Sequence, residues 1–344
     1  MTPETVDTSL GREMLPPWLE PELERLLALH DAGHLHHALL LTGRTGLGKR
    51  LLAGVLARGL LCQQGRGAQR PCGHCRGCQL TAGQSHPDLR LLEPDPGKGQ
   101  GEILVDRVRG LVDFLHLSAQ RGGSRVAVIV PCDRLNRAAA NSLLKSLEEP
   151  PSGVYLILAT GRPGRLPPTV RSRCTVRSLH PPSLEVAEQW LRAHTGHGPE
   201  QIQQALGLAG DMPLAAERVL RHQGLETYEV LLQQLQRLTA GGDPVKEAEA
   251  WEQSPQALAD GVATILAELL RQCHGAPDRG LLSAELGRQL MARSSPEALH
   301  EAFLRIGEHR RHLEQPLNAR LVAEAILLEV HRTLGGNAAQ RSRQ

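Results

Sequence analysis

The sequence feature that most restricts the fold of this chain is a glycine-rich segment with a lysine. It lies between an apolar run and a helical run. The segment is Gly43-Arg44-Thr45-Gly46-Leu47-Gly48-Lys49-Arg50. Residues 38–41 before it are typical of a buried strand, and residues 51–61 after it are typical of a helix. This order of elements predicts a phosphate-binding loop. Its backbone N–H groups and the Lys49 ammonium would contact phosphate, and the turn would depend on Gly43, Gly46 and Gly48.

The residue after Lys49 departs from the pattern of loops that hydrolyse nucleotides. Such loops have Ser or Thr at this position, because the hydroxyl binds Mg²⁺. Here the position holds Arg50, which has no acceptor atom and carries its own positive charge. The sequence therefore predicts a degenerate loop without a Mg²⁺ site, and we expect ATP binding in this chain to be weak or absent.

A cysteine cluster follows the helix after the loop. Four of the seven cysteines lie there, at Cys62, Cys72, Cys75 and Cys78. Four thiolates suit a tetrahedral structural Zn²⁺ ion, and Gly73 and Gly77 allow the tight turns between them. Free or redox-active thiols and an iron–sulfur cluster are the alternatives. The segment is too short and polar to form its own core, so a metal would supply its folding energy.

Composition excludes several classes of protein. The net charge is +2 and aromatic residues make up 2% of the chain, so neither a strong basic field nor base stacking favours direct DNA binding. The sequence has no run of 18 apolar residues and no secretion signal at its beginning. We therefore expect a cytoplasmic protein without membrane contact.

Strands and helices alternate up to residue 182, and helices alone follow. Further strands are predicted at 88–92, 125–130, 154–159 and 175–179, which indicates an α/β domain with a mostly parallel sheet and helices on both faces. The predicted division is a tail (1–17), an α/β domain (18–182) with a zinc module (62–78), a small helical domain (183–242), a larger helical domain (243–334) and a second tail (335–344).

Three further motifs carry a family resemblance. Strand 125–130 leads into PCDRLN, residues 138–151 read AAANSLLKSLEEPP, and Ser172-Arg173-Cys174 follows the next strand. With the cysteine cluster, they resemble the bacterial clamp loaders, AAA+ subunits of the DNA polymerase III holoenzyme. The match covers nearly all of residues 18–182. It implies an AAA+ domain, a helical lid (183–242) and a helical collar (243–334).

The resemblance also indicates which kind of subunit this is. The motor subunits, gamma and tau, have an Asp-Glu pair that binds Mg²⁺ through water and orients the attacking water. Aligned through Asn141, that pair falls on Val130 and Pro131, which can do neither. Asp133 comes three residues late, and we expect it to lie off the end of the strand. The chain therefore resembles the non-hydrolysing member of the family; an active gamma- or tau-like ATPase is the alternative.

The Ser-Arg-Cys motif implies a role in trans. In the family its arginine, here Arg173, acts as an arginine finger on the ATP of a neighbouring subunit, and nearby Arg171 is the competing candidate. Thr160 matches the family's sensor position and is expected to be structural.

The resemblance implies partners as well: gamma or tau copies and delta, the sliding clamp, and primed DNA through the assembled complex. We expect no intrinsic ATPase activity, although the holoenzyme as a whole is a nucleotidyltransferase. A zinc-bearing DNA-binding module outside replication is a third hypothesis, disfavoured by charge, by the scarcity of aromatic residues and by the AAA+ motifs.

Overall fold

The computed structural model describes residues 15–94, 101–119, 123–313 and 317–335. It divides into two compact units, Met1–Ser183 and Leu184–Gln344. Most of the two predicted tails (1–17 and 335–344) lies outside the described residues.

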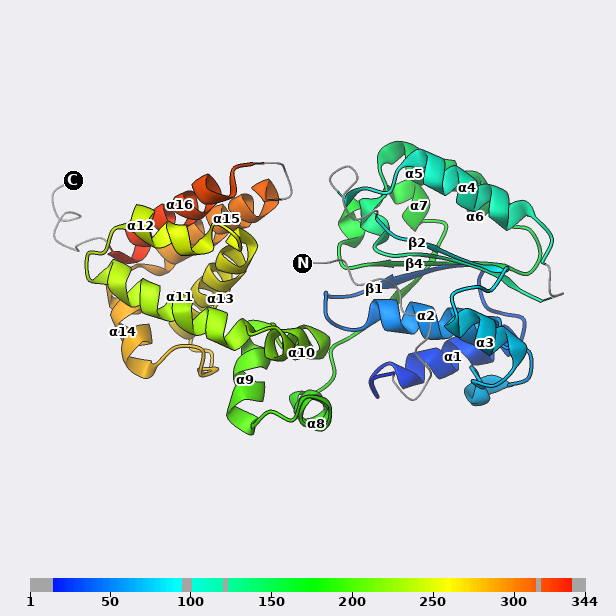
Figure 1. Ribbon diagram of the computed structural model, residues 1–344, viewed down its shortest axis with the longest axis horizontal. Helices are drawn as coiled ribbons and strands as arrows, with labels where there is room; N and C mark the ends of the chain where they lie inside the picture. Colours follow the sequence, from blue (N-terminus) through cyan, green and yellow to red (C-terminus); the bar gives the residue numbers. More distant parts are fainter. Residues whose placement is uncertain (1–14, 95–100, 120–122, 314–316, 336–344) are drawn as a thin grey trace. The chain divides into compact units, whose positions relative to one another are not determined.

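The first unit is built on a parallel sheet (Figure 1). Within the described residues the sheet has five strands in the order β2-β3-β4-β1-β5. The central strands read as continuous apolar runs because both of their faces are covered by helices. The predicted α/β class is confirmed, and each strand lies within one residue of its predicted bounds: β1 (Ala38–Thr42), β2 (Leu89–Leu92), β3 (Arg125–Ile129), β4 (Val154–Thr160) and β5 (Thr175–Ser178).

Helices cover both faces of this sheet, as predicted. In Figure 1, α1, α2 and α3 lie below the sheet and α4 to α7 lie above it. On the upper face, Leu111 and Leu115 of α4 share an apolar cluster with Ile129 of β3 and Leu156 of β4. The helices are α1 (Glu20–Asp31), α2 (Lys49–Leu60), α3 (Arg76–Ala82), α4 (Val105–His116), α5 (Arg137–Ser142), α6 (Leu144–Glu148) and α7 (Pro168–Arg171), with short 3₁₀ turns η2 (Gly67–Gln69), η4 (Cys132–Arg134) and η5 (Pro163–Arg165).

Two details of these helices were not visible in the sequence. The motif at residues 138–151 is divided between α5 and α6, which meet at Leu143. The short helix α3 was not predicted, because it is too short to show a period. It starts at Cys75, whose sulfur accepts a hydrogen bond from the Cys78 N–H as an N-cap.

The parallel sheet brings the carboxyl ends of distant strands to one edge. Thr42 at the end of β1 pairs in register with Thr160 at the end of β4 on one side and with Ser178 of β5 on the other. Segments that follow strands in the sequence therefore meet at this edge, which is where open α/β sheets bind ligands.

The second unit is helical and has two apolar clusters among its described residues. Helices α8 to α10 enclose the smaller cluster, and Tyr228 to Leu334 contribute to the larger one. Its helices are α8 (Leu184–Thr195), α9 (Pro199–Leu208), α10 (Pro213–Arg221), α11 (Gly224–Thr239), α12 (Pro244–Ala248), α13 (Pro255–Cys273), α14 (Ala284–Arg293), α15 (Pro296–His312) and α16 (Ala319–Val330), with short turns η6 (Glu249–Trp251) and η7 (His331–Gly335).

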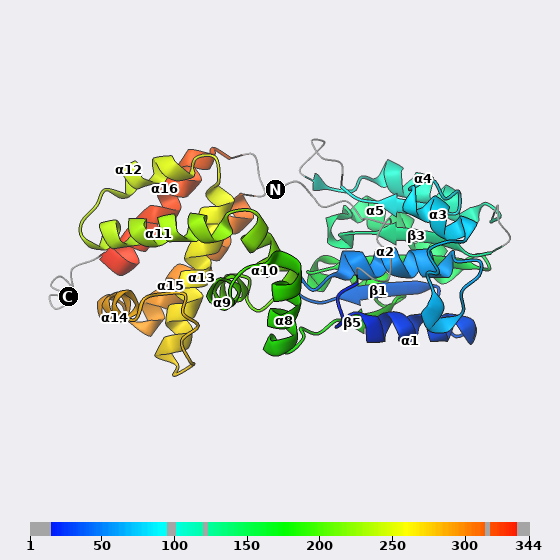
Figure 2. The same cartoon turned by 60° about the horizontal axis from the view of Figure 1, so that its bottom comes forward.

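Helix α11 joins the two clusters. Figure 2 shows α9 and α10 near one end of α11, and its Leu225 packs against the smaller cluster, while Leu231 and Leu235 belong to the larger one. The division into lid and collar at residue 242 stays a prediction. No helix in the described part of the chain is both long and apolar enough to cross a bilayer.

Candidate functional site

The glycine-rich loop joins β1 to α2 at the carboxyl edge of the sheet. Its glycines have positive φ angles, of 139° at Gly43, 90° at Gly46 and 96° at Gly48. Space is limiting at Gly43, where a Cβ atom would lie 2.8 Å from the carbonyl oxygen of Leu179. Gly48 is the N-cap of α2, so the first N–H groups of the helix face the loop. The backbone is thus shaped to place N–H groups around an anion.

The Lys49 side chain folds back onto its own loop. Its Nζ donates to the carbonyl oxygens of Gly43 and Arg44, at 2.8 Å each. Burial lowers the pKa of Lys49 to about 8, while the nearby Asp133 carboxylate acts in the opposite direction. The loop lysine is therefore held by carbonyl groups, in a place where its charge is poorly solvated.

Asp133 lies off the end of β3, as expected from the sequence, and it also lies close to Lys49. It belongs to the 3₁₀ turn Cys132–Arg134, which curls directly after β3. Its carboxylate accepts a hydrogen bond from the Thr160 hydroxyl at the end of β4. The sequence does not show that this turn returns Asp133 to the ends of the strands. Through this hydrogen bond Thr160, the residue at the family's sensor position, contacts a residue close to Lys49.

The position that would hold a metal-binding hydroxyl is occupied by an ion pair. The Arg50 guanidinium donates to the carboxylate of Glu93, which directly follows β2. The side chains of Arg50 and Glu93 are only 23% and 17% exposed. Sequence reasoning did not find Glu93; its place directly after a strand was the available signal. At the end of β3, Val130 is buried and offers no oxygen ligand from its side chain.

Arg173 lies two residues beyond α7 and is held by two acceptors. Its Nε donates to Glu148 Oε1 at 2.7 Å, and its Nη1 donates to the Thr169 carbonyl at 2.9 Å. The Arg173 side chain is 34% exposed. Arg171, the competing candidate, is also exposed. Among the described hydrogen bonds of Arg173, none reaches the glycine-rich loop.

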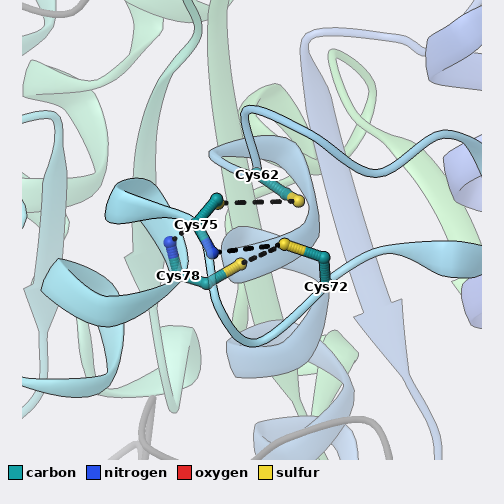
Figure 3. A group of neighbouring side chains, drawn as sticks. All are labelled: Cys62, Cys72, Cys75 and Cys78. Carbon is teal, nitrogen blue, oxygen red and sulfur yellow. Dashed lines mark hydrogen bonds between the residues drawn. The ribbon is translucent and has the colours of Figure 1, made fainter.

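The four predicted cysteines form one cluster (Figure 3). Their sulfur atoms all lie within 4.8 Å of one another, with 4.0 Å between those of Cys72 and Cys78 and 4.0 Å between those of Cys62 and Cys75. Sulfurs bound to a tetrahedral zinc ion at about 2.3 Å are about 3.8 Å apart. The donor set and spacing therefore fit a structural Zn²⁺ ion.

The electrostatics of the cluster also suit a cation. Burial acts to raise the pKa of Cys75, but N–H groups of Cys78 and Gln63 donate to its sulfur and lower the pKa to about 6. Burial raises the pKa of neighbouring Cys78 to about 12. Without a positive charge between them, these neighbouring thiols do not all ionise. A bound divalent metal would supply that charge.

The cysteine segment is fastened to the rest of the unit by polar contacts and close packing. The buried Arg70 side chain donates to Asp31 at 2.5 Å and to the carbonyl of Leu27 at 3.3 Å, both in α1. A Cβ atom at Gly77 would lie 2.3 Å from the carbonyl oxygen of Leu61, so only glycine fits there. These contacts fix the segment against α1 and the end of α2.

Comparison with known proteins identifies the family. A family model described as "DNA polymerase III, delta subunit" matches residues 20–183. The chain is 40% identical to DNA polymerase III subunit delta′ of Escherichia coli K12 over 262 residues, which cover 76% of this chain and 77% of that protein. It is also 36% identical to DNA polymerase III subunit tau of the same organism over 176 residues, 50% of this chain and 26% of tau.

A structural likeness exists as well. A gamma-subunit-related protein from Thermotoga maritima aligns with 92% of this chain and 99% of its own, at 17% identity and a TM-score of 0.47. At these values the likeness adds nothing to the assignment, which depends on the sequence relatives. Identity of 40% over about three quarters of both chains shows that this protein belongs to the family of DNA polymerase III delta′ subunits.

Proposed function

We propose that this chain is the non-hydrolysing AAA+ subunit of the clamp loader of DNA polymerase III, and that it supplies Arg173 in trans to the ATP site of a neighbouring gamma or tau subunit. In this proposal the chemistry is divided between chains. The neighbour binds and hydrolyses ATP, and this chain completes the neighbour's site while it stabilises the assembly.

The ion pair between Arg50 and Glu93 is the observation that carries the proposal. Hydrolysis in related loops needs a hydroxyl oxygen on Mg²⁺ next to the loop lysine. Here a guanidinium takes that position and already has a carboxylate partner. A divalent cation placed beside it would be repelled by the Arg50 charge. Nucleotide that reached the loop would therefore lack its metal, and we infer that it is not hydrolysed.

Two features of Arg173 support the role in trans. Its side chain is one-third exposed, so a partner chain can reach it. Its guanidinium is planar and matches the geometry of phosphate oxygens. An arginine supplied by a neighbouring chain raises the rate of phosphoryl transfer by about 10³–10⁵ in other systems.

The second unit is proposed to contain the lid (183–242) and the collar (243–334), with the collar as the main contact with gamma or tau and delta. Large apolar side chains are exposed on α15 and α16, where Leu304 is 55%, Leu321 61% and Leu328 48% exposed. Exposed leucines along neighbouring helices are typical of a subunit interface. Contact with the sliding clamp and with primed DNA would follow through the complete loader in the cytoplasm.

The test is ATP hydrolysis by the reconstituted loader, stimulated by clamp and primed DNA. Arg173→Ala in this chain alone should remove about the turnover of one motor site while assembly stays intact, because the lost arginine would stabilise one transition state. Arg171→Ala is the matched control and should not change turnover. Equal turnover for wild type and Arg173→Ala would refute the role in trans, and a loss with Arg171→Ala alone would assign the finger to that residue.

One observation favours the second candidate, an active gamma- or tau-like ATPase. Asp133 lies near Lys49 and could offer the carboxylate that Val130 and Pro131 lack. The isolated chain decides between the two. Hydrolysis that depends on Mg²⁺ and disappears in Asp133→Asn would establish the active ATPase, whereas background turnover supports the non-hydrolysing subunit.

A further inference from the structure

The contacts of Arg173 use part of its guanidinium and leave the rest available. Nε and Nη2 lie 2.7 and 2.5 Å from the same oxygen of Glu148, and Nη1 donates to the Thr169 carbonyl at 2.9 Å. A guanidinium has five N–H donors, so these contacts leave one on Nη1 and one on Nη2. Paired donors of this kind are what arginine uses to bind a phosphate in a bidentate manner.

Both acceptors are on elements that the core holds in place. Glu148 ends α6, where the preceding Leu147 is buried, and Thr169 lies in α7, where the following Val170 is completely buried. Leu147 and Val170 belong to the same apolar cluster, on the upper face of the sheet. The two acceptors therefore have a fixed spacing, and they hold the Arg173 side chain between them.

We infer that Glu148 is a positioning residue for the arginine finger, an inference that rests on the proposed function of Arg173. A surface ion pair of this exposure contributes little to folding. The ion pair instead orients the Arg173 side chain. A long side chain that is already ordered loses less entropy when it binds the transition state. Glu148 itself touches no nucleotide and acts only through Arg173.

The adjacent carboxylate provides a matched control. Glu149 is exposed and carries the same charge one residue further along, but the described hydrogen bonds of Arg173 do not include it. If negative charge near Arg173 is what matters, removing the charge of either glutamate should lower turnover. If the orientation of Arg173 is what matters, only the substitution of Glu148 should lower it.

The test compares wild type, Glu148→Gln, Glu149→Gln, Arg173→Ala and the double variant Glu148→Gln/Arg173→Ala in the reconstituted loader. Glu148→Gln should lower the arginine-dependent part of kcat by about tenfold, since small misplacement of a catalytic group is costly. KM for ATP should stay unchanged, and Glu149→Gln should match wild type. The double variant should equal Arg173→Ala, because a residue that acts through Arg173 has no effect once Arg173 is absent.

A second measurement reports on the pair in the isolated chain. The Arg173 Nε–H resonance, identified by its loss in Arg173→Ala, should exchange slowly with water in wild type and in Glu149→Gln and quickly in Glu148→Gln. An unchanged exchange rate in Glu148→Gln would refute the inference. So would wild-type kcat for Glu148→Gln while Arg173→Ala lowers turnover. If Arg173→Ala itself has no effect, the proposed function fails, and the exchange measurement still tells whether Glu148 orders Arg173.

Discussion

The guanidinium of Arg50, the residue directly after the lysine of the glycine-rich loop, forms an ion pair with the carboxylate of Glu93. The two residues are 43 positions apart in the chain, and they meet because β1 and β2 end at the same edge of a parallel sheet. The positive charge at this edge of the sheet is thus carried by the Arg50 side chain, which is part of the protein itself. An exchangeable metal ion would compete with a side chain that is always present and always charged.

Restoring a hydroxyl at this position should not restore hydrolysis. Arg50→Thr supplies one metal ligand, but Val130 and Pro131 still lack the carboxylates that hold the metal and orient water. Phosphate release by the purified Arg50→Thr variant should equal the background of the wild-type chain. Arg50→Lys, which keeps the charge, is the control. Appreciable turnover by Arg50→Thr alone would show that Asp133 provides the missing acid.

Zinc content should depend on the cysteine cluster. Wild-type protein should bind about one zinc ion per chain, and Cys72→Ser should release it and lower solubility, because three sulfurs cannot complete the tetrahedral site. Atomic absorption of protein dialysed against metal-free buffer measures this. Cys273→Ser changes an exposed cysteine outside the cluster and should leave zinc content unchanged. Stoichiometric zinc in Cys72→Ser would count against a site of four cysteines.

Lys49 should make the stability of the fold depend on pH. Its pKa falls from 10.5 to about 8 on folding, so between these values the unfolded chain binds more protons than the folded chain. The free energy of unfolding should therefore gain a contribution from Lys49 as pH rises from 8 to 10.5. Lys49→Met lacks this contribution. Denaturant titrations at several pH values should show the wild-type free energy rising relative to that of Lys49→Met; a constant difference would contradict the prediction.

A buried ion pair should contribute to the stability of the first unit. The side chains of Arg125 and Asp88 are 3% and 1% exposed, with 3.1 Å between Arg125 Nη2 and Asp88 Oδ1. Asp88→Ala would leave the buried guanidinium without its charge partner, which should lower the free energy of unfolding by about 3–5 kcal/mol. Asp106→Ala, which removes an exposed partner of Arg109, should change it by less than about 0.5 kcal/mol. Equal effects of the two substitutions in urea titrations would contradict this.

The strands and most helices could be predicted because each is encoded by its own local pattern. A strand covered on both faces, such as β3, shows a continuous apolar run, here Val126 to Ile129, and this is visible without knowledge of its neighbours. The unpredicted helix α3 has no such pattern. It depends on a cap by Cys75 and on the absence of a side chain at Gly77, where the Leu61 carbonyl approaches.

The sequence by itself determined the α/β class, the glycine-rich loop and the four-cysteine set, since the pattern of each is carried by residues close together in the chain. Only the tertiary structure decided that Glu93 pairs with Arg50, that Asp133 reaches Thr160 and that Glu148 holds Arg173. These pairs join side chains that are between 25 and 43 residues apart. These contacts depend on the order of the strands in the sheet and on the turns after each strand. Neither can be predicted from a local pattern of residue types.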